Sequence, residues 1–128
     1  MNAVEAGPLN DAAPHFAYGR SAVLTLEGEL CRSELGDLSG LLEHVARQGC
    51  SQVVLDLSEV SHFDYRGVQP LIGWAERLRE VGGDLKLAGL SPYLHAIFRS
   101  AGGAGAFDFY AEKNDAVSAF ARGVFVSG

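Results

Sequence analysis

A short apolar run, QVVLDL at residues 52–57, constrains the fold more than any other feature of this sequence. Its apolar residues follow one another without the alternation typical of a strand that has one face in water. Such a run indicates a strand buried on both faces, as in parallel sheets covered by helices. We therefore expect residues 52–57 to form a central strand. The more polar stretch that follows, SEVSHFD at residues 58–64, is expected to be a loop.

Two amphipathic patterns flank this strand and predict helices that cover the same face of the sheet. Before the strand, apolar residues recur at three- and four-residue steps from Leu35 to Val45. After it, a second helix should begin shortly after Asp64, and Pro70 should make that helix start late or kink, because proline lacks an N–H. Trp74 falls on the flank of this helix, and we expect it to pack under the neighbouring helix. The apolar residues that share the inner face are Val68, Leu71, Ile72, Ala75 and Leu78.

The remaining segments complete an α/β pattern. HFAY at residues 15–18 and SAVLTLEG at 21–28 alternate like the two strands of an antiparallel hairpin. DLKLAGL at 84–90 and FDFY at 107–110 predict further strands, and helices should start at Ser91 and, after an Asn114 cap, run over 115–123. Strands separated by helices imply right-handed parallel connections. The predicted fold is a single α/β domain with a mostly parallel sheet of four to five strands, an antiparallel edge hairpin and about four helices.

Length and charge limit the class of protein. A chain of 128 residues suits one domain, which we expect at 15–122 after a flexible leader at 1–14 and before a short C-terminal tail at 123–128. The formal net charge of -6 disfavours binding to nucleic acid or to anionic membranes. No stretch has the pattern of a signal peptide or the length of a membrane span, so we expect a cytoplasmic protein. Cys31 and Cys50 should then be reduced and unpaired.

Residue types suited to catalysis occur, but none forms a recognised catalytic pattern. Ser61, His62 and Asp64 are the types of a hydrolase triad, yet neighbours in sequence seldom converge in that way, and no GxSxG elbow exists. The glycine-rich segment 101–106 follows a helix and lacks a lysine, so it indicates a helix stop rather than a phosphate loop. Asp56 and Asp64 either form a carboxylate pair at the carboxyl end of the central strand or each cap a turn. We expect no enzyme activity, no metal site and no cofactor.

Several short blocks, in order, resemble the STAS family. Its members read as an apolar strand ending in DLS, a loop to DSSG, and then an amphipathic helix. The matching blocks here are Asp56-Leu57-Ser58 and Asp64-Tyr65-Arg66-Gly67. The matching blocks extend from LTLEGEL at 24–30 to the helix end at 101–102. The resemblance as a whole covers about four-fifths of the chain, residues 20–122. It implies that Asp56, Ser58 and Gly67 are structural positions of the motif.

The chain departs from the family pattern at three positions. Tyr65 stands where the family has its phosphoacceptor serine or threonine, and its side chain is too bulky for a serine kinase site shaped around a small hydroxyl. Cys31 stands where the family has the aspartate of LxGxLD, which implies the loss of a turn-stabilising carboxylate. Pro70 lies just inside the helix that follows the motif. The usual serine phosphorylation switch is therefore not expected at Tyr65.

The resemblance implies a non-catalytic regulatory module that binds a protein partner. In the anti-sigma factor antagonists of this family, the unmodified domain binds an anti-sigma factor kinase, and phosphorylation abolishes that binding. We expect an anti-sigma factor or a related kinase-like regulator as partner, and leave open whether the chain forms a homodimer. The alternative is an accessory STAS subunit of a lipid-transport ATPase or of a stressosome-type assembly. The expected partner-binding residues are Ser61, His62, Asp64, Tyr65, Arg66 and Gln69, with Glu76 and Arg77 at the rim.

Overall fold

The structure is a computed structural model that describes residues 21–127, with side chains as far as residue 120. Strands and helices alternate along this part of the chain, as the sequence predicts for a parallel sheet. The elements in chain order are β1 (Ser21–Leu30), α2 (Arg32–Arg47), β2 (Gln52–Phe63), the 3-10 helix η1 (Tyr65–Gly67), α3 (Val68–Glu80), β3 (Asp84–Ala88), α4 (Pro92–Ser100), β4 (Phe109–Tyr110) and α5 (Lys113–Ser127).

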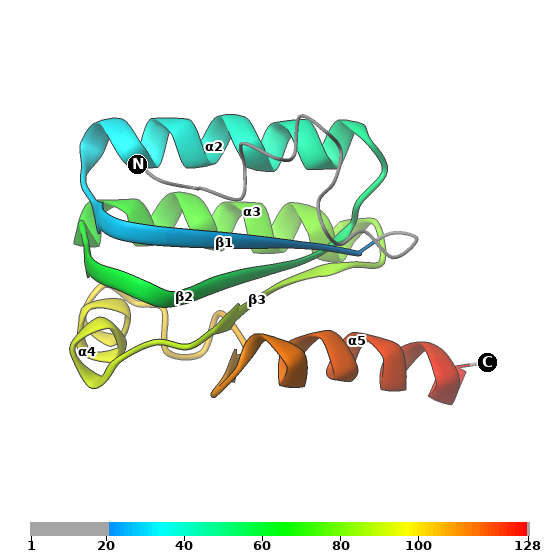
Figure 1. Ribbon diagram of the computed structural model, residues 1–128. Helices are drawn as coiled ribbons and strands as arrows, with labels where there is room; N and C mark the ends of the chain where they lie inside the picture. Colours follow the sequence, from blue (N-terminus) through cyan, green and yellow to red (C-terminus); the bar gives the residue numbers. More distant parts are fainter. Residues whose placement is uncertain (1–20, 128) are drawn as a thin grey trace.

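The four strands form one parallel sheet in the order β1-β2-β3-β4 (Figure 1). β2 has a neighbour on each side, which confirms that the QVVLDL run is a central strand. In the register, Leu55 of β2 lies opposite Leu24 of β1 and Leu87 of β3. All three side chains are fully buried. The β-α-β connections therefore build the α/β fold that the sequence predicts.

The expectation of a loop at residues 58–64 is wrong, because β2 continues as a strand to Phe63. β1 runs beside it to Leu30 and provides the hydrogen-bonding partner, with Leu30 opposite Phe63. The pairing changes register twice along this extension, as at a β-bulge. Val60 and Phe63 are buried, so the extension also contributes to the core. The extension pairs with β1 only, because the pairing of β2 with β3 ends at Asp56. Its polar residues therefore did not indicate a strand in the sequence.

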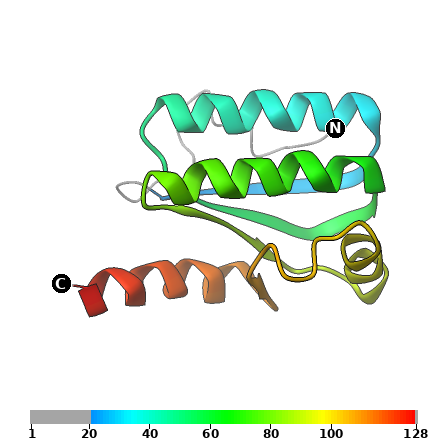
Figure 2. The ribbon, with the colours of Figure 1, turned by 180° about the vertical axis from the view of Figure 1, so that it is seen from behind.

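The two faces of the sheet are covered differently (Figure 2). α2 and α3 lie side by side on one face and bury an apolar stripe each, which confirms the helix faces read from the sequence. α5 covers the other face, where Ala116 and Phe120 pack on Val23, Val54 and Ala88. α4 adds Leu94 and Phe98 to the larger core. The domain thus has helices on both sides of a buried sheet.

Pro70 has the expected effect on the start of α3. After the 3-10 turn at Tyr65–Gly67, the α-helix begins only at Val68. Pro70 then lies in its first turn, where a backbone N–H has no partner within the helix and its absence costs little. The proline therefore displaces the helix start away from Tyr65 without a kink in the helix interior.

Two sequence expectations concern the ends of the domain. The strand expected at 15–18, and with it the antiparallel hairpin, lies outside the described residues, as does the leader at 1–14. The last helix differs from its prediction, because α5 starts at Lys113 and continues to Ser127. Asn114 is inside this helix rather than its cap, and the helix runs through most of the segment expected as a tail. The sequence past residue 120 has only a weak amphipathic pattern, so the helix was not predicted to continue to Ser127.

Candidate functional site

The residue at the family's phosphoacceptor position lies in a short turn that follows β2. The Asp64 N–H donates to the carbonyl oxygen of Leu30, 2.9 Å away, which ties the start of the turn to the end of β1. The Asp64 carboxylate then accepts a hydrogen bond of 2.9 Å from the Arg66 N–H and caps the 3-10 helix. Asp64 thus has the capping role that the resemblance implies.

The side chain of Arg66 reinforces this cap. Its Nε and Nη2 atoms donate to the two carboxylate oxygens of Asp64 at 3.0 and 2.7 Å, in the two-point geometry favoured by guanidinium and carboxylate. These hydrogen bonds, with the backbone N–H of Arg66, hold the pKa of Asp64 at about 2. Asp64 is therefore charged throughout the physiological range, and the turn is pre-organised.

Tyr65 is presented to solvent by this turn. Its side chain is 64% exposed, the highest value among the exposed large hydrophobic side chains of the described residues. It borders a shallow hollow on α4, whose other lining residues are Tyr93, Ala96, Ile97, Ser100 and Ala101. An exposed phenol beside an apolar hollow is a surface suited to a protein contact.

His62 joins this surface to α4. Its Nδ1 atom lies 2.7 Å from the hydroxyl of Tyr93, at hydrogen-bond distance. Tyr93 is 53% exposed and was not among the candidate site residues. Nothing in the sequence pattern pointed to it, because it lies 28 residues beyond Tyr65 on another helix. Tyr93 and Ile97 are the additions that the tertiary structure makes to the candidate site.

The other predicted contact residues lie on β2 and α3. Ser61 is exposed near the end of β2. Gln69 donates from Nε2 to the carbonyl oxygen of Ala101 at 3.0 Å, so it also links α3 to the end of α4. Glu76 and Arg77 are exposed farther along α3, and their place at the rim of the contact surface stays a prediction.

Trp74 packs into the protein, as expected. It is only 8% exposed and belongs to the larger core. The guanidinium carbon of Arg77 lies 4.0 Å from the centroid of its ring, within the range of a cation–π contact. Arg77 therefore covers Trp74 as well as contributing charge to the surface.

The structural motif residues have identifiable roles. Asp56 is buried, accepts the Ser58 N–H at 3.1 Å and pairs with Lys113 at 3.9 Å. A Cβ atom at Gly67 would lie 2.5 Å from Cδ1 of Leu35, so any side chain there would require the leucine to move. Asp56 and Asp64 line different hollows. Of the two alternatives left open for these residues, capping holds for Asp64, whereas Asp56 lies inside β2 and accepts the Ser58 N–H within that strand. The two carboxylates do not form a pair, because Asp64 pairs with Arg66 and Asp56 with Lys113.

Another carboxylate partly replaces the aspartate that the family has at the position of Cys31. Cys31 is exposed and immediately precedes α2, where its N–H donates to a carboxylate oxygen of Glu34 at 3.1 Å. The carboxylate that stabilises this helix start thus comes from the third residue of the helix. Both cysteines are free, as expected, and burial raises the pKa of the Cys50 thiol.

The arrangement of these groups does not assemble a hydrolase triad. His62 is directed to Tyr93 and Asp64 to Arg66, so neither activates Ser61. Among the described side chains, no group of three or more His, Cys, Asp or Glu residues could hold a metal ion. Within residues 21–127, no helix has the length and apolarity needed to cross a membrane.

Comparisons with known proteins agree with this geometry. Residues 17–107 match the family model described as Mlab, STAS domain. The fold is similar to SpoIIAA, an anti-sigma factor antagonist, in its unphosphorylated form, with 23% identity, a TM-score of 0.72, and coverage of 84% of this chain and 93% of that one. It is similar to the phosphorylated form of SpoIIAA, a Bacillus cell fate determinant, with 22% identity, a TM-score of 0.65, and coverage of 82% and 95%.

A third solved structure comes from a transport protein. The STAS domain of a SulP transporter from Vibrio cholerae has 18% identity to this chain, a TM-score of 0.67, and coverage of 98% of this chain and 99% of that domain. No curated protein matches the chain significantly. The family model spans more than half of the sequence, and the four-stranded parallel sheet with its helices has the same fold as these structures. The chain therefore belongs to the STAS domain family.

Proposed function

We propose that this STAS domain is a non-catalytic regulatory module that acts in the cytoplasm by binding an anti-sigma factor or a related kinase-like regulator. The partner docks on a surface centred on Tyr65, which we call the Tyr65 surface. Its members are the predicted residues Ser61, His62, Asp64, Tyr65, Arg66, Gln69, Glu76 and Arg77, together with Tyr93 and Ile97 of α4.

The exposure of Tyr65 on a rigid turn is the observation that carries this proposal. A tyrosine that is 64% exposed places apolar area in water, which a partner would remove. The Asp64–Arg66 pair holds the turn in one geometry, so little conformational entropy is lost when a partner binds. Tyrosine and arginine are also enriched among residues that contribute most to protein interfaces.

The mode of control is proposed to differ from that of SpoIIAA, which is known in phosphorylated and unphosphorylated forms. Here a phenol occupies the position of the acceptor serine. A serine kinase that modifies ordinary family members would not phosphorylate this site. The domain then binds its partner without that switch, or is controlled by phosphorylation elsewhere, for example on Ser58 or Ser61, both of which are exposed.

Calorimetry with a captured partner tests the Tyr65 surface. Tyr65→Ala and Arg66→Glu should each weaken binding by about 1 to 3 kcal/mol and leave the free energy of unfolding almost unchanged. Two variants serve as matched controls. Val81→Ala removes another exposed apolar side chain, at the far end of α3, and Arg47→Glu reverses a charge at the far end of α2. Full affinity in both Tyr65 and Arg66 variants would place the interface elsewhere.

A second function has support from the transport protein among the similar structures. The alternative that we propose is an accessory subunit of a lipid-transport ATPase or of a stressosome-type assembly. The SulP transporter supports it only in that a STAS domain of the same fold occurs in a transport protein. The identity of the captured partner separates the two functions. A histidine-kinase-like ATPase supports the regulatory module, whereas subunits of a transporter support the accessory role.

A further inference from the structure

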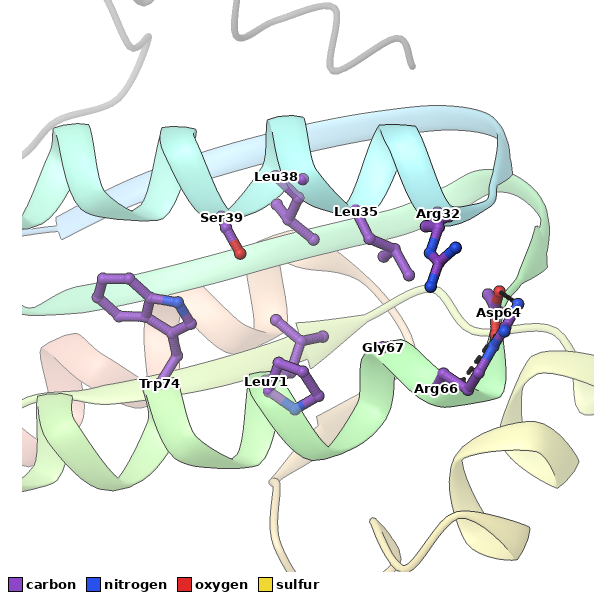
Figure 3. A pocket seen from close by; sticks show the side chains of 11 residues that line it. Arg32, Leu35, Leu38, Ser39, Asp64, Arg66, Gly67, Leu71 and Trp74 are labelled. Carbon is purple, nitrogen blue, oxygen red and sulfur yellow. Dashed lines mark hydrogen bonds and ion pairs between the residues drawn. The ribbon is translucent and has the colours of Figure 1, made fainter.

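A groove with a volume of about 280 Å³ lies between α2 and α3 (Figure 3). We call it the α2–α3 groove. Its walls are apolar along most of their length, with Leu35 and Leu38 contributed by α2, and Leu71 and Trp74 by α3. Ser39 points into the space between the two helices. The groove is separate from the hollow beside Tyr65 and shares no lining residue with it.

One end of the groove is cationic. The Arg32 side chain extends from the start of α2 towards the turn that contains Asp64 and Arg66. Arg66 is engaged with Asp64 through two hydrogen bonds. Arg32 is exposed, and within the described part of the chain its guanidinium has neither an ion pair nor a hydrogen bond. The unengaged cation at this end is therefore Arg32.

The charges that line the groove leave a net positive charge at this end. Arg32 and Arg66 contribute two positive charges and Asp64 one negative charge, and the remaining lining residues are uncharged. The net charge is +1, on a molecule whose formal net charge is -6. The α2–α3 groove, apolar along its length and with a net positive charge at one end, is complementary to a ligand that has an apolar chain and one negative charge.

The size of the groove restricts the ligand further. Pockets that bind small molecules commonly have volumes of about 300 to 1,000 Å³, and this groove lies just below that range. Its volume suits one narrow chain and is too small to enclose a two-chain lipid or a dinucleotide. The guanidinium of Arg32 provides paired N–H donors that fit the two oxygens of a carboxylate.

We propose that the α2–α3 groove binds a single-chain amphiphile with a carboxylate head, of the class of medium-chain fatty acids. The alkyl chain lies against Leu35, Leu71 and Trp74, and the carboxylate pairs with Arg32. The charged end of the groove borders the proposed partner surface, because Asp64 and Arg66 belong to both. Ligand binding can nevertheless be measured on the isolated chain, so its failure is distinguishable from a failure of partner binding.

Titration with decanoate, below the concentration at which it forms micelles, tests the proposal. Trp74 is the only tryptophan of the chain, so its fluorescence reports on the groove directly. We expect saturable binding that tightens by up to about fourfold for each added CH₂ from hexanoate to decanoate, because each buried methylene contributes about 0.8 kcal/mol. Acetate should leave the fluorescence unchanged. Absence of saturation, or of any dependence on chain length, would overturn the proposal.

The head group is tested with decanol and with an arginine variant. Decanol should bind at least about tenfold more weakly than decanoate, because it cannot form a charged pair with Arg32. Arg32→Gln should weaken decanoate binding by a similar factor and leave decanol binding unchanged. Arg47→Gln, which removes an exposed charge from the other end of α2, is the matched control. Equal affinity of the parent chain for decanoate and decanol would overturn the carboxylate assignment.

A variant that fills the groove tests the location. Ser39→Phe should abolish binding of decanoate and decanol together, whereas Ser118→Phe, on an exposed position of α5 across the sheet, should leave both unchanged. Circular dichroism establishes that each variant is folded. If Ser39→Phe destabilises the chain, Ser39→Leu provides a smaller filling side chain for the same measurement. Unaltered decanoate binding in a folded variant with a filled groove would place the ligand elsewhere.

Discussion

The carboxylate of Asp64 makes two interactions with one residue, Arg66. It caps the 3-10 helix through the N–H of Arg66 and forms a two-point ion pair with the guanidinium of the same residue. The ion pair requires the charged carboxylate, and the hydrogen bond from the backbone N–H is stronger to the charged form. They hold the backbone on each side of Tyr65, so the conformation of that residue depends on the ionisation of its neighbour.

The first prediction concerns the titration of Asp64. Its pKa is lowered from 3.8 to about 2, mainly by the hydrogen bonds from Arg66. A lowered folded-state pKa stabilises the fold above the usual pKa, and this contribution is lost as the pH falls through about 2. We expect NMR titration of the carboxyl carbon to show a midpoint near 2, and Arg66→Gln to move it upwards. An unchanged midpoint in Arg66→Gln would mean that the ion pair does not form in solution.

The second prediction concerns phosphorylation at residue 65. Incubation with ATP and a serine kinase that acts on ordinary family members should leave Tyr65 unmodified, as measured by mass spectrometry. Tyr65→Ser should restore a small hydroxyl at the start of the 3-10 turn and accept phosphate, provided that Arg66 does not obstruct the kinase. The double variant Tyr65→Ser, Arg66→Ser separates these two effects. Phosphate on Tyr65 of the parent chain would contradict the prediction.

At the scale of elements, α5 is attached to the sheet by a small apolar cluster and one buried cation. Lys86 of β3 is 8% exposed, with its Nζ atom 3.0 Å from Asp108 and 3.3 Å from Asp84. The same atom lies 4.8 Å from the ring centroid of Phe120 on α5. Burial alone would lower the pKa of Lys86, but the pairs with Asp108 and Asp84 outweigh it and the pKa is raised. Lys86 is therefore charged beneath the helix.

The third prediction follows from this contact. Lys86→Ala should loosen α5 more than the rest of the domain, because it removes both the lysine stem that packs under the helix and the cation next to Phe120. We expect hydrogen exchange of the α5 amides to become about tenfold faster, while that of the α3 amides changes little. Ser118→Ala, at an exposed position of α5, is the comparison. Equal acceleration in α3 and α5 would show that the lysine stabilises the whole domain rather than one helix.

At the scale of the whole molecule, stability depends on the core between the sheet and the pair α2 and α3. Leu55 is fully buried at the centre of β2, and Leu71 is 3% exposed on α3. The fourth prediction is that Leu55→Ala or Leu71→Ala lowers the free energy of unfolding by about 2 to 5 kcal/mol, because each leaves a cavity. Glu76→Ala, on the exposed face of α3, should leave the free energy of unfolding almost unchanged. Similar losses in all three variants, measured by urea denaturation, would contradict this description of the core.

Much of this architecture could be predicted from patterns within single segments of the sequence. The continuous apolar run at residues 52–57 predicted a central strand, and the spacing of leucines predicted the buried faces of α2 and α3. Pro70 predicted the late start of α3. These features depend on the periodicity of one segment and on the backbone chemistry of single residues, so they leave a signature in the sequence.

The tertiary structure alone decided which residues from different segments meet. β2 extends to Phe63 because β1 lies beside it, and the polar residues of that extension gave no sign of a strand. Tyr93 belongs to the Tyr65 surface, and Arg32 points towards the turn that contains Arg66, only because α4 and α2 pack where they do. Periodicity reports which face of an element is buried, whereas such contacts depend on how the elements pack together. The sequence therefore determined the elements and the position of Tyr65, and packing determined the surface and the groove around it.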